Sequence, residues 1–544
     1  MSEVNRKWHS GMTTSEDWWA VWLGLMLFAA GLTSIMGVDM VGWMAKTKTW
    51  VDPGWNHWLK PAGKAYKGMH PLVSFAATYA VFTALTCIGA YSMKLNVKKF
   101  FMGWTIIFIT TWACWIIGHE GHFKALKTSQ SLNNPEIYGD DVYCTTKVHK
   151  CTKEINKALK KLGVDIKKGE VPDAATASKA IDKAKHAKRL SWGLQLGGGF
   201  SFILALTVGL IIGNFFKGFA AFLKEAAKPE WYIKTAIVYL GIKIGMMSMK
   251  AAGFVFELAI AGMCATIVAY MLFWPITYWM GRRFFSLPRA ASAVLSSGIS
   301  ICGVSAAIAT AGAIRAKAVL PVMVSMLIVV FAMFELIILP GLYVAIAPDQ
   351  PIVNGAAMGM TVKTDGADAA AGAILDELQR AYGARKGIHW EEGSILASAI
   401  MTKIWIDMFI GVWAFVLAII WVYHVERKPG QSKVPVSEIW HRFPKFVIGY
   451  FFCWFVYLGI AVLGTPELMK AAHGGANIVQ SPMRKMMFML TFVSIGVITD
   501  FSKLKGMGKL TLLYAIALFG VIAPIAYIVA WIFHHGMMPP IVTP

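Results

Sequence analysis

The chain has 544 residues, of which 57% are hydrophobic and only 15% are charged, and its mean hydropathy is +0.56. A soluble domain carries about 25% charged residues, so the composition excludes a soluble or disordered protein. The formal net charge of +22 does not indicate nucleic acid as a partner. The Lys and Arg residues lie in loops between apolar stretches, where membrane orientation, anionic lipid and attraction of an anionic solute explain them better.

Apolar runs of about 20 residues recur along the chain and predict an all-α polytopic membrane protein with about 11–13 transmembrane segments. The first 17 residues are polar and Trp18 opens a span, so we expect no cleaved signal peptide. The predicted spans cover residues 18–35, 72–93, 101–118, 191–215, 232–249, 254–280, 288–313, 319–347, 394–423, 446–463, 485–499 and 510–533.

The composition divides the chain into four parts. Residues 1–119 are N-terminal transmembrane helices with a Trp- and Lys-rich loop, and residues 120–190 are a polar, basic insert. The insert holds 15 Lys and Arg against 9 Asp and Glu, and its pattern fits a small helical domain or a partly ordered loop. Residues 191–347 and 348–544 are two further transmembrane parts, each expected to contain one broken helix.

Cysteine usage separates the insert from the spans. Cys144 and Cys151 lie in the insert with six residues between them, a spacing that permits a disulfide if the insert is extracytoplasmic; a metal pair is the alternative. The five other cysteines lie in or beside apolar spans and are expected to behave as small hydrophobic residues. A cytoplasmic N-terminus would place the insert outside and several loop lysines and arginines inside, as the positive-inside rule favours.

The stretch of residues 296–307, which lies inside an apolar span, does not suit an ordinary transmembrane helix. Small polar residues and Gly at membrane depth are tolerated where the backbone meets protein, water or ligand. The stretch is therefore either a broken helix that lines a transport site or a packing face of small residues. Its candidate binding residues are Ser296, Ser297, Gly298, Ser300, Cys302, Gly303 and Ser305.

A second unusual stretch runs from Thr361 to Ala370. If it is helical, Thr361 and Asp365 lie one turn apart and Asp368 follows, which places hydroxyl and carboxylate oxygens together for a proton or a small cation. The alternative is an exposed loop that leads into a helix capped by Thr364 or Asp365.

Isolated ionisable residues within spans are costly and usually face a cavity. Lys403 and Asp407 lie four residues apart and can pair on one helix, for a structural or a functional purpose. Asp500, at the end of a span, is expected to act as a cap, and Glu257 to reach the membrane interface. Lys243 has apolar chain on both sides and is the hardest of the set to explain structurally.

The two unusual stretches share a pattern. Gly303-Val-Ser305-Ala-Ala and Gly366-Ala-Asp368-Ala-Ala both read Gly, small apolar, polar, Ala, Ala, and Gly241, Lys250 and Gly253 align with Gly496, Lys505 and Gly508. Repeats with broken segments at corresponding places indicate the site of a secondary transporter. The members of the pairs occur in opposite order along the chain, so one pairing is chance or the second half is permuted.

Several segments of the chain, including both unusual stretches, resemble the YeiH-type sulfate exporter family of bacterial inner-membrane proteins. The matching segments are residues 15–22, 229–234, 239–243, 300–307, 363–368 and 442–446, of which Ser300-Ile-Cys-Gly303 is the most specific. The resemblance implies a fold distantly similar to bile-acid and sodium/proton antiporter transporters, with inverted repeats, a panel domain and a core domain. In that fold discontinuous helices cross near mid-membrane, and Ser300–Ser305 and Thr364–Asp368 would lie at the crossings.

The leading hypothesis is a secondary transporter of a small anionic solute, sulfate-like or an organic acid, coupled to H+ or Na+ in a bacterial inner membrane. Helix N-termini and hydroxyls would bind the anion, Lys243, Lys363 or Lys403 would supply charge, and Thr361, Thr364, Asp365, Asp368 or Asp407 would couple the ion. A channel, or a sensor that binds a partner through the insert, is the alternative. No enzyme motif occurs, so no catalytic activity, cofactor or metal is expected, and a homodimer is one oligomeric state left open.

Overall fold

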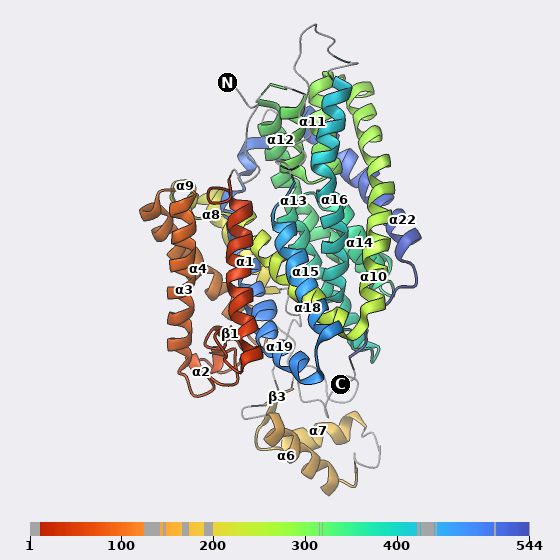
Figure 1. Cartoon of the computed structure of the whole chain (residues 1–544). Coiled ribbons are helices and arrows are strands. Elements are labelled where there is room, and N and C mark those ends of the chain that lie inside the picture. Colours follow the sequence, from red (N-terminus) through yellow and green to blue (C-terminus); the bar gives the residue numbers. More distant parts are fainter. Residues whose placement is uncertain are drawn as a thin grey trace.

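The computed structural model describes residues 11–123, 142–144, 148–165, 173–189, 200–314, 316–317, 319–421, 425, 440, 443–504 and 508–542. Figure 1 shows α1, α3 and α4 on one side of a helical bundle and α11 to α16 on the other. The first group comprises α1 (Glu16–Leu32), η1 (Thr33–Met36), β1 (Ala45–Thr47), α2 (Trp55–Trp58), β2 (Leu59–Pro61), α3 (Pro71–Ser92) and α4 (Val97–Ile117). Strands β1 and β2 pair antiparallel, with Ala45 opposite Pro61.

The beginning of α1 follows its sequence signals. The Ser15 side chain accepts a hydrogen bond from the Trp18 amide, and Glu16 and Asp17 occupy the first turn. Both features satisfy or complement the free amide groups at a helix N-terminus.

The described part of the insert contains two helices and a two-stranded sheet. They are β3 (Val142–Cys144), α6 (Val148–Lys161), α7 (Ala174–Lys183) and β4 (Ala187–Arg189), with β3 antiparallel to β4. A small apolar core of its own joins α6 to α7, including Ile155, Leu159 and Ile181. Cys151 is disulfide-bonded, whereas the side chain of Cys144 lies outside the described part.

The remaining helices follow the insert along the chain. They are α8 (Phe200–Phe215), α9 (Lys217–Leu223), α10 (Pro229–Arg283), α11 (Arg289–Ser300), α12 (Gly303–Ala313), α13 (Val319–Ile346), α14 (Pro351–Thr361), α15 (Asp365–Arg385), α16 (Ser394–Ile420), α18 (Phe446–Leu463), α19 (Pro466–Ile478), η5 (Val479–Met483), α20 (Arg484–Ile498), η6 (Phe501–Leu504), α21 (Gly508–Ala515), η7 (Ile516–Ile522) and α22 (Ala523–His534). The helices α19, η5 and α20 follow one another without a break, as do α21, η7 and α22.

The expectation of an all-α, multi-pass architecture is confirmed, but the number of spans differs. Nine segments within the described residues are long and apolar enough to cross a membrane, or ten if α8 and α9, which meet at 116°, count as one span. The sequence prediction of about 11–13 counted residues 232–249 and 254–280 as two spans, whereas both belong to α10. It also counted residues 288–313, which the structure divides into two short helices, α11 and α12.

The first half of α10 forms the centre of the bundle. Nearly every residue from Trp231 to Met247 is buried. Val238 lies against two glycines on different helices, Gly24 of α1 and Gly449 of α18. Glycines at these contacts let helix backbones approach closely. Such close packing is the main source of helix association in a membrane, because lipid tails are as apolar as the buried side chains.

A second close contact joins α8 to α20. Gly209 and Gly213 are four residues apart on α8, and a Cβ atom on either would meet the backbone of α20 around Gly496. This is a small-xxx-small contact, and the Gly-x-x-x-Gly spacing in the sequence is the signal for it.

We therefore expect Gly496→Leu to force α8 and α20 apart and to lower the free energy of unfolding by about 1–3 kcal/mol or more, through overpacking. Thermal melting of the detergent-solubilised protein measures the effect. Gly459→Leu on α18 is the matched control, because a Cβ atom there meets nothing within 4 Å. Equal melting temperatures for the two variants would contradict the close contact.

Candidate functional site

The first unusual stretch is an interrupted helix. Helix α11 ends at Ser300, the backbone leaves helical geometry at Ile301 (φ −114°, ψ −112°), and α12 begins at Gly303. Gly303 has φ +33°, in the left-handed region that glycine adopts most easily. The short α11 and α12 therefore place one carbonyl end and one amide end inside the bundle.

The second unusual stretch is interrupted in the same manner. Helix α14 ends at Thr361, Val362 is extended, and α15 begins at Asp365. The Thr364 hydroxyl accepts a hydrogen bond of 3.1 Å from the Ala367 amide, so Thr364 is the N-cap. The capping alternative is thus correct for Thr364, but these residues are buried rather than part of an exposed loop.

The two interruptions meet. A Cβ atom on Gly303 would contact the carbonyl oxygen of Lys363 at 2.6 Å, so only glycine allows this approach of the two chains. The Cys302 thiol donates a hydrogen bond of 3.0 Å to Oδ1 of Asp365. The crossing of two broken segments, which the resemblance implied, therefore has direct contacts in the structure.

Lys403 of α16 joins both interruptions. Its Nζ donates to the carbonyl oxygen of Ile301 at 3.1 Å and to that of Val362 at 3.2 Å. These carbonyls are at the C-terminal ends of α11 and α14, where the helix dipoles concentrate negative charge. With 2% of its side chain exposed, Lys403 neutralises both ends in the absence of water.

Acidic groups surround this ammonium group. Asp407, one turn further along α16, has a carboxylate oxygen 4.0 Å from Lys403 Nζ, and the ligand atoms of Cys302, Asp365 and Asp407 all lie within 4.8 Å of one another. Neither carboxylate oxygen of Asp407 or of Asp368 has a hydrogen-bond donor among the described residues, and both side chains are buried. The crossing thus contains two buried carboxylates without hydrogen-bond donors in the described part of the chain, of which Asp407 lies beside the ammonium group of Lys403.

Lys363 and Glu335 complete the charged groups of the crossing. The Lys363 amide donates to Oε2 of Glu335 on α13 at 3.2 Å, and the Lys363 ammonium group donates to the Met360 carbonyl. The same ammonium group lies 5.0 Å from the ring centre of Phe273, which a cation favours. Sequence reasoning missed Glu335, although a single acid inside the span at 319–347 is the signal used for Lys403 and Asp407.

The donor set of this cluster does not identify a metal centre. Cys302, Asp365 and Asp407 are close enough to share an ion. However, the Cys302 thiol donates a hydrogen bond to Asp365, whereas a sulfur ligand binds metal as the thiolate. Lys403 moreover places a fixed positive charge beside Asp407.

The predicted serines do not all face the crossing. Ser297 accepts a hydrogen bond of 2.9 Å from the Trp274 indole, and Ser300 lies 3.5 Å from the Thr277 hydroxyl, so both join α11 to α10. Ser296 is buried, and Gly298 packs near Val324 and Ile328 of α13.

Ser305 and Thr361 also lie differently from the prediction. Ser305 is exposed toward a cavity outside the crossing, because it follows Gly303 by two residues, or about 200° around the helix. Thr361 is buried, and its hydroxyl bonds the Ala357 carbonyl and the Tyr343 hydroxyl. Neither side chain reaches Asp365 or Asp407 through any contact in the described structure.

Two cavities lie at opposite ends of α1. The larger, of about 1020 Å³, is lined by Ser34 and Gly37 just beyond the end of α1, and the smaller, of about 340 Å³, by Ser15 to Trp18 at its start. Since α1 is long enough to cross a membrane, the cavities approach the bundle from opposite sides. The smaller one reaches Val304 and Ser305 in the first turn of α12.

The larger cavity is basic. Five lysines and three acidic residues line it: Lys46, Lys64, Lys243, Lys470, Lys485, Asp39, Glu391 and Glu392. Burial and the neighbouring charge of Lys60 lower the pKa of Lys46, as crowding of cations does. The positive charge of these walls favours the entry of anions.

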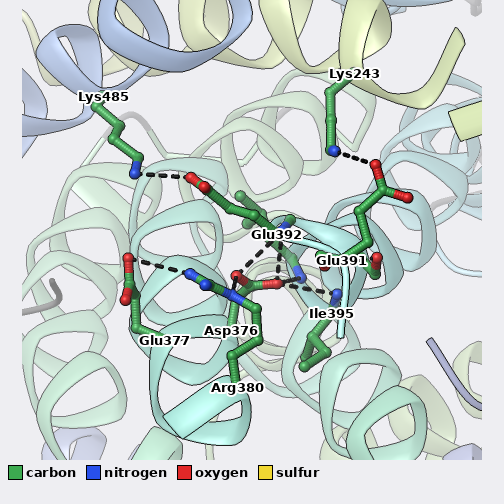
Figure 2. A network of polar contacts seen from close by, with 11 residues as sticks. Lys243, Asp376, Glu377, Arg380, Glu391, Glu392, Ile395 and Lys485 are labelled. Carbon is green, nitrogen blue, oxygen red and sulfur yellow. Dashed lines mark hydrogen bonds and ion pairs between the residues drawn. The ribbon is translucent and has the colours of Figure 1, made fainter. Parts of the chain in front are cut away.

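Lys243 belongs to this cavity and not to the crossing. Its Nζ is 2.8 Å from Oε1 of Glu391, and Lys485 is 2.8 Å from Glu392, so α10 and α20 each hold the turn between α15 and α16 (Figure 2). The charge of Lys485 holds the pKa of Glu392 well below its usual range. Glu391, Glu392 and Lys485 were not predicted as site residues, because they lie at the ends of predicted spans.

Asp376 fixes the start of α16 beside these ion pairs. Its carboxylate accepts hydrogen bonds from the amides of Gly393 at 3.0 Å and Ile395 at 3.2 Å, and from Nε of Arg380 at 2.8 Å (Figure 2). A carboxylate at a helix N-terminus satisfies free amides and complements the dipole. The network therefore sets the position of α16, the helix that carries Lys403 and Asp407.

Two isolated charges have peripheral roles. Asp500 accepts from the amide of Ser502 and pairs with Lys217 at 3.3 Å, in agreement with a capping role. Glu257 is exposed on α10. Lys250 and Lys505 have side chains outside the described residues, so their predicted correspondence is not tested.

Comparison with known proteins agrees with this architecture. A family model described as "Conserved hypothetical protein 698" matches residues 198–515, a range that includes both interruptions, Lys403 and the network of Figure 2. The UPF0324 membrane protein NE0724 of Nitrosomonas europaea is 60% identical over 547 residues, covering 99% of this chain and all of that protein. The chain belongs to the UPF0324 membrane protein family.

Other relatives match a smaller part of the chain. The UPF0324 membrane protein RB9488 of Rhodopirellula baltica is 36% identical over 317 residues, which cover 57% of this chain and 53% of that protein. An uncharacterized protein of Archaeoglobus fulgidus is 46% identical over 166 residues, 27% of this chain and 88% of its own length. No solved structure matches. The UPF0324 names state that these relatives are membrane proteins and name no substrate, so the sulfate-exporter resemblance and the antiporter-like relationship remain predictions.

Proposed function

We propose that this UPF0324 protein is a secondary active transporter of a small anionic solute, sulfate-like or an organic acid, coupled to protons or sodium. One observation carries the proposal: two interrupted helices meet between cavities that open at opposite ends of α1. Broken helices that cross inside a bundle are typical of transporters that expose one site alternately to the two sides.

The charge of the larger cavity supports an anionic solute. Its five lysines exceed its acidic residues by two, and the amide ends of α12 and α15 point into the crossing, where their dipoles favour negative charge. The proposal includes the inverted-repeat relation of the two broken segments, with panel and core domains, and a bacterial inner-membrane location.

Burial of the crossing favours a carrier over a channel. Asp365, Lys403 and Asp407 are each 3% exposed or less, so neither cavity opens onto these charges in this conformation. A channel needs a continuous aqueous path, whereas a carrier is closed on at least one side at all times. A sensor that binds a partner through the insert is the remaining alternative, and lack of exchange for every anion would favour it.

Exchange in proteoliposomes tests the proposal. Purified protein is reconstituted and loaded in turn with unlabelled sulfate, phosphate, acetate or succinate, and entry of the same radiolabelled anion is followed. We expect saturable counterflow of at least one anion, absent from empty liposomes and from the Lys403→Met variant. Conductance that does not saturate would identify a channel, and lack of exchange for every anion would reject a transporter of these solutes.

A further inference from the structure

We propose that the coupling ion is a proton, that the buried carboxyl pair Asp365–Asp407 carries it, and that Lys403 occupies the place a sodium ion would take. This inference rests on the proposed transport function and assigns the ion that the sequence left open. Three features carry it: the contacts of Lys403, the distances among the acids, and the missing hydrogen-bond donors.

The oxygen atoms that a sodium ion would use already bind Lys403. Unwound carbonyls of broken helices are the usual ligands of a coupling sodium ion. At this crossing, the carbonyls of Ile301 and Val362 already accept hydrogen bonds from Lys403 Nζ, at 3.1 and 3.2 Å. A sodium ion at the same oxygens would lie next to the ammonium group, and two like charges repel strongly where water is excluded.

The carboxyl groups of Asp365 and Asp407 are buried and close together. Asp365 accepts a hydrogen bond from Cys302, whereas neither oxygen of Asp407 has a donor among the described residues, although their ligand oxygens lie within 4.8 Å of each other. Two carboxylates so close in a dry site cannot both stay ionised. The ammonium group of Lys403 balances one of them, and a shared proton neutralises the other.

The neighbouring charges do not remove this excess. The Lys363 ammonium group donates a hydrogen bond to the Met360 carbonyl, and the Lys363 backbone amide donates to the carboxylate of Glu335. Glu230 and Lys234 face Asp365 from α10, but they oppose each other in charge and form an ion pair at 3.4 Å. Asp368 adds a further carboxylate without a donor in the described structure and supplies no positive charge.

The position of the pair explains how the proton would act on the fold. Loss of the proton leaves Asp407 fully charged at 4.0 Å from Lys403, which draws the ammonium group from the carbonyls of Ile301 and Val362. These hydrogen bonds join the two interrupted helices, so protonation and the geometry of the crossing are linked. When the smaller cavity, which reaches Val304 two residues from Cys302, opens onto the pair, the proton is released on that side.

Solute uptake driven by a pH gradient is compared with uptake driven by a sodium gradient. Proteoliposomes containing a trapped fluorescent pH indicator receive radiolabelled sulfate, phosphate, acetate or succinate, under a pH gradient without sodium or under a sodium gradient without a pH difference. For the wild type we expect accumulation and proton flux under the pH gradient alone, and no accumulation of radiolabelled sodium. Asp407→Asn and Asp365→Asn should each lower pH-driven accumulation by an order of magnitude or more. Asp349→Asn, on an exposed ion pair, is the matched control.

A second readout does not depend on transport. Infrared difference spectra of the purified protein should contain the carbonyl stretch of a protonated, buried carboxylic acid that disappears in Asp407→Asn and persists in Asp349→Asn. Sodium-driven uptake, sodium binding, or pH-driven accumulation retained in both Asn variants would overturn the proton assignment. Lack of counterflow in the wild type would refute the transport function alone, while an absent carboxylic acid band would still refute the shared proton.

Discussion

Replacing Lys403 with Met is expected to abolish solute exchange and to lower the free energy of unfolding by about 3–5 kcal/mol, the cost of breaking a buried ion pair. The substitution leaves the carbonyls of Ile301 and Val362 without their donor and Asp407 without its nearest positive charge. The loss is large because the site is closed to water, which cannot replace the ammonium group. Counterflow in proteoliposomes and thermal melting in detergent measure the two effects.

Two further variants separate the buried charge from a general effect of losing a lysine. Lys386→Met removes an exposed ammonium group that pairs with Asp349, and its melting temperature should match that of the wild type. The double variant Lys403→Met/Asp407→Asn should regain part of the stability, since it removes the unbalanced carboxylate, but not transport. A single variant as stable as the wild type would show that Lys403 does not hold the two interruptions together.

Replacing Gly303 with Val is expected to have the second largest effect, because it forces the two interruptions apart. A Cβ atom at this position meets the Lys363 carbonyl oxygen and Ile328 Cγ2, both at 2.6 Å. Overpacking costs about 1–3 kcal/mol, and a left-handed backbone costs a non-glycine residue roughly 1–2 kcal/mol more. We expect a lower melting temperature together with loss of counterflow.

Gly341→Ala provides the comparison for Gly303→Val. Gly341 lies inside α13, and a Cβ atom there meets nothing within 4 Å. Alanine should therefore stabilise the helix by roughly 0.5–1 kcal/mol, with counterflow preserved. If Gly303→Val exchanged solute at the wild-type rate, the close approach at the crossing would be irrelevant to transport.

The positions of Lys234 and Lys243 on α10 show how one helix lines both cavities. Lys234 lines the smaller cavity and pairs with Asp17 at 2.7 Å, while Lys243 lines the larger cavity and pairs with Glu391 at 2.8 Å. They are nine residues apart, or about 13 Å along a helix. The part of α10 between the two cavities is thus short. The charged crossing packs against this part of α10 through Ile233, which lies near Gly366.

Much of the candidate site could be located from the sequence. Ser, Gly, Thr and Asp inside apolar runs are incompatible with a lipid-facing helix, and this local signal located both interruptions. It left the cap of α15 open between Thr364 and Asp365, and the structure shows that the cap is Thr364. The i, i+4 spacing correctly placed Lys403 and Asp407 on one helix, although their oxygen and nitrogen atoms are separated by 4.0 Å. Glu335 was missed because a single acid near the middle of an apolar run was not weighed with the others.

The sequence by itself determined the membrane class, the multi-pass helical architecture and the places where α11–α12 and α14–α15 break, since hydropathy, capping and glycine act over a few residues. Only the tertiary structure decided which side chains meet. Lys403 bonds carbonyls that lie 102 and 41 residues away in the chain, Lys243 pairs with Glu391 instead of entering the crossing, and Ser305 faces the smaller cavity. The direction of a side chain depends on how its helix is rotated and packed against others, which no local pattern encodes.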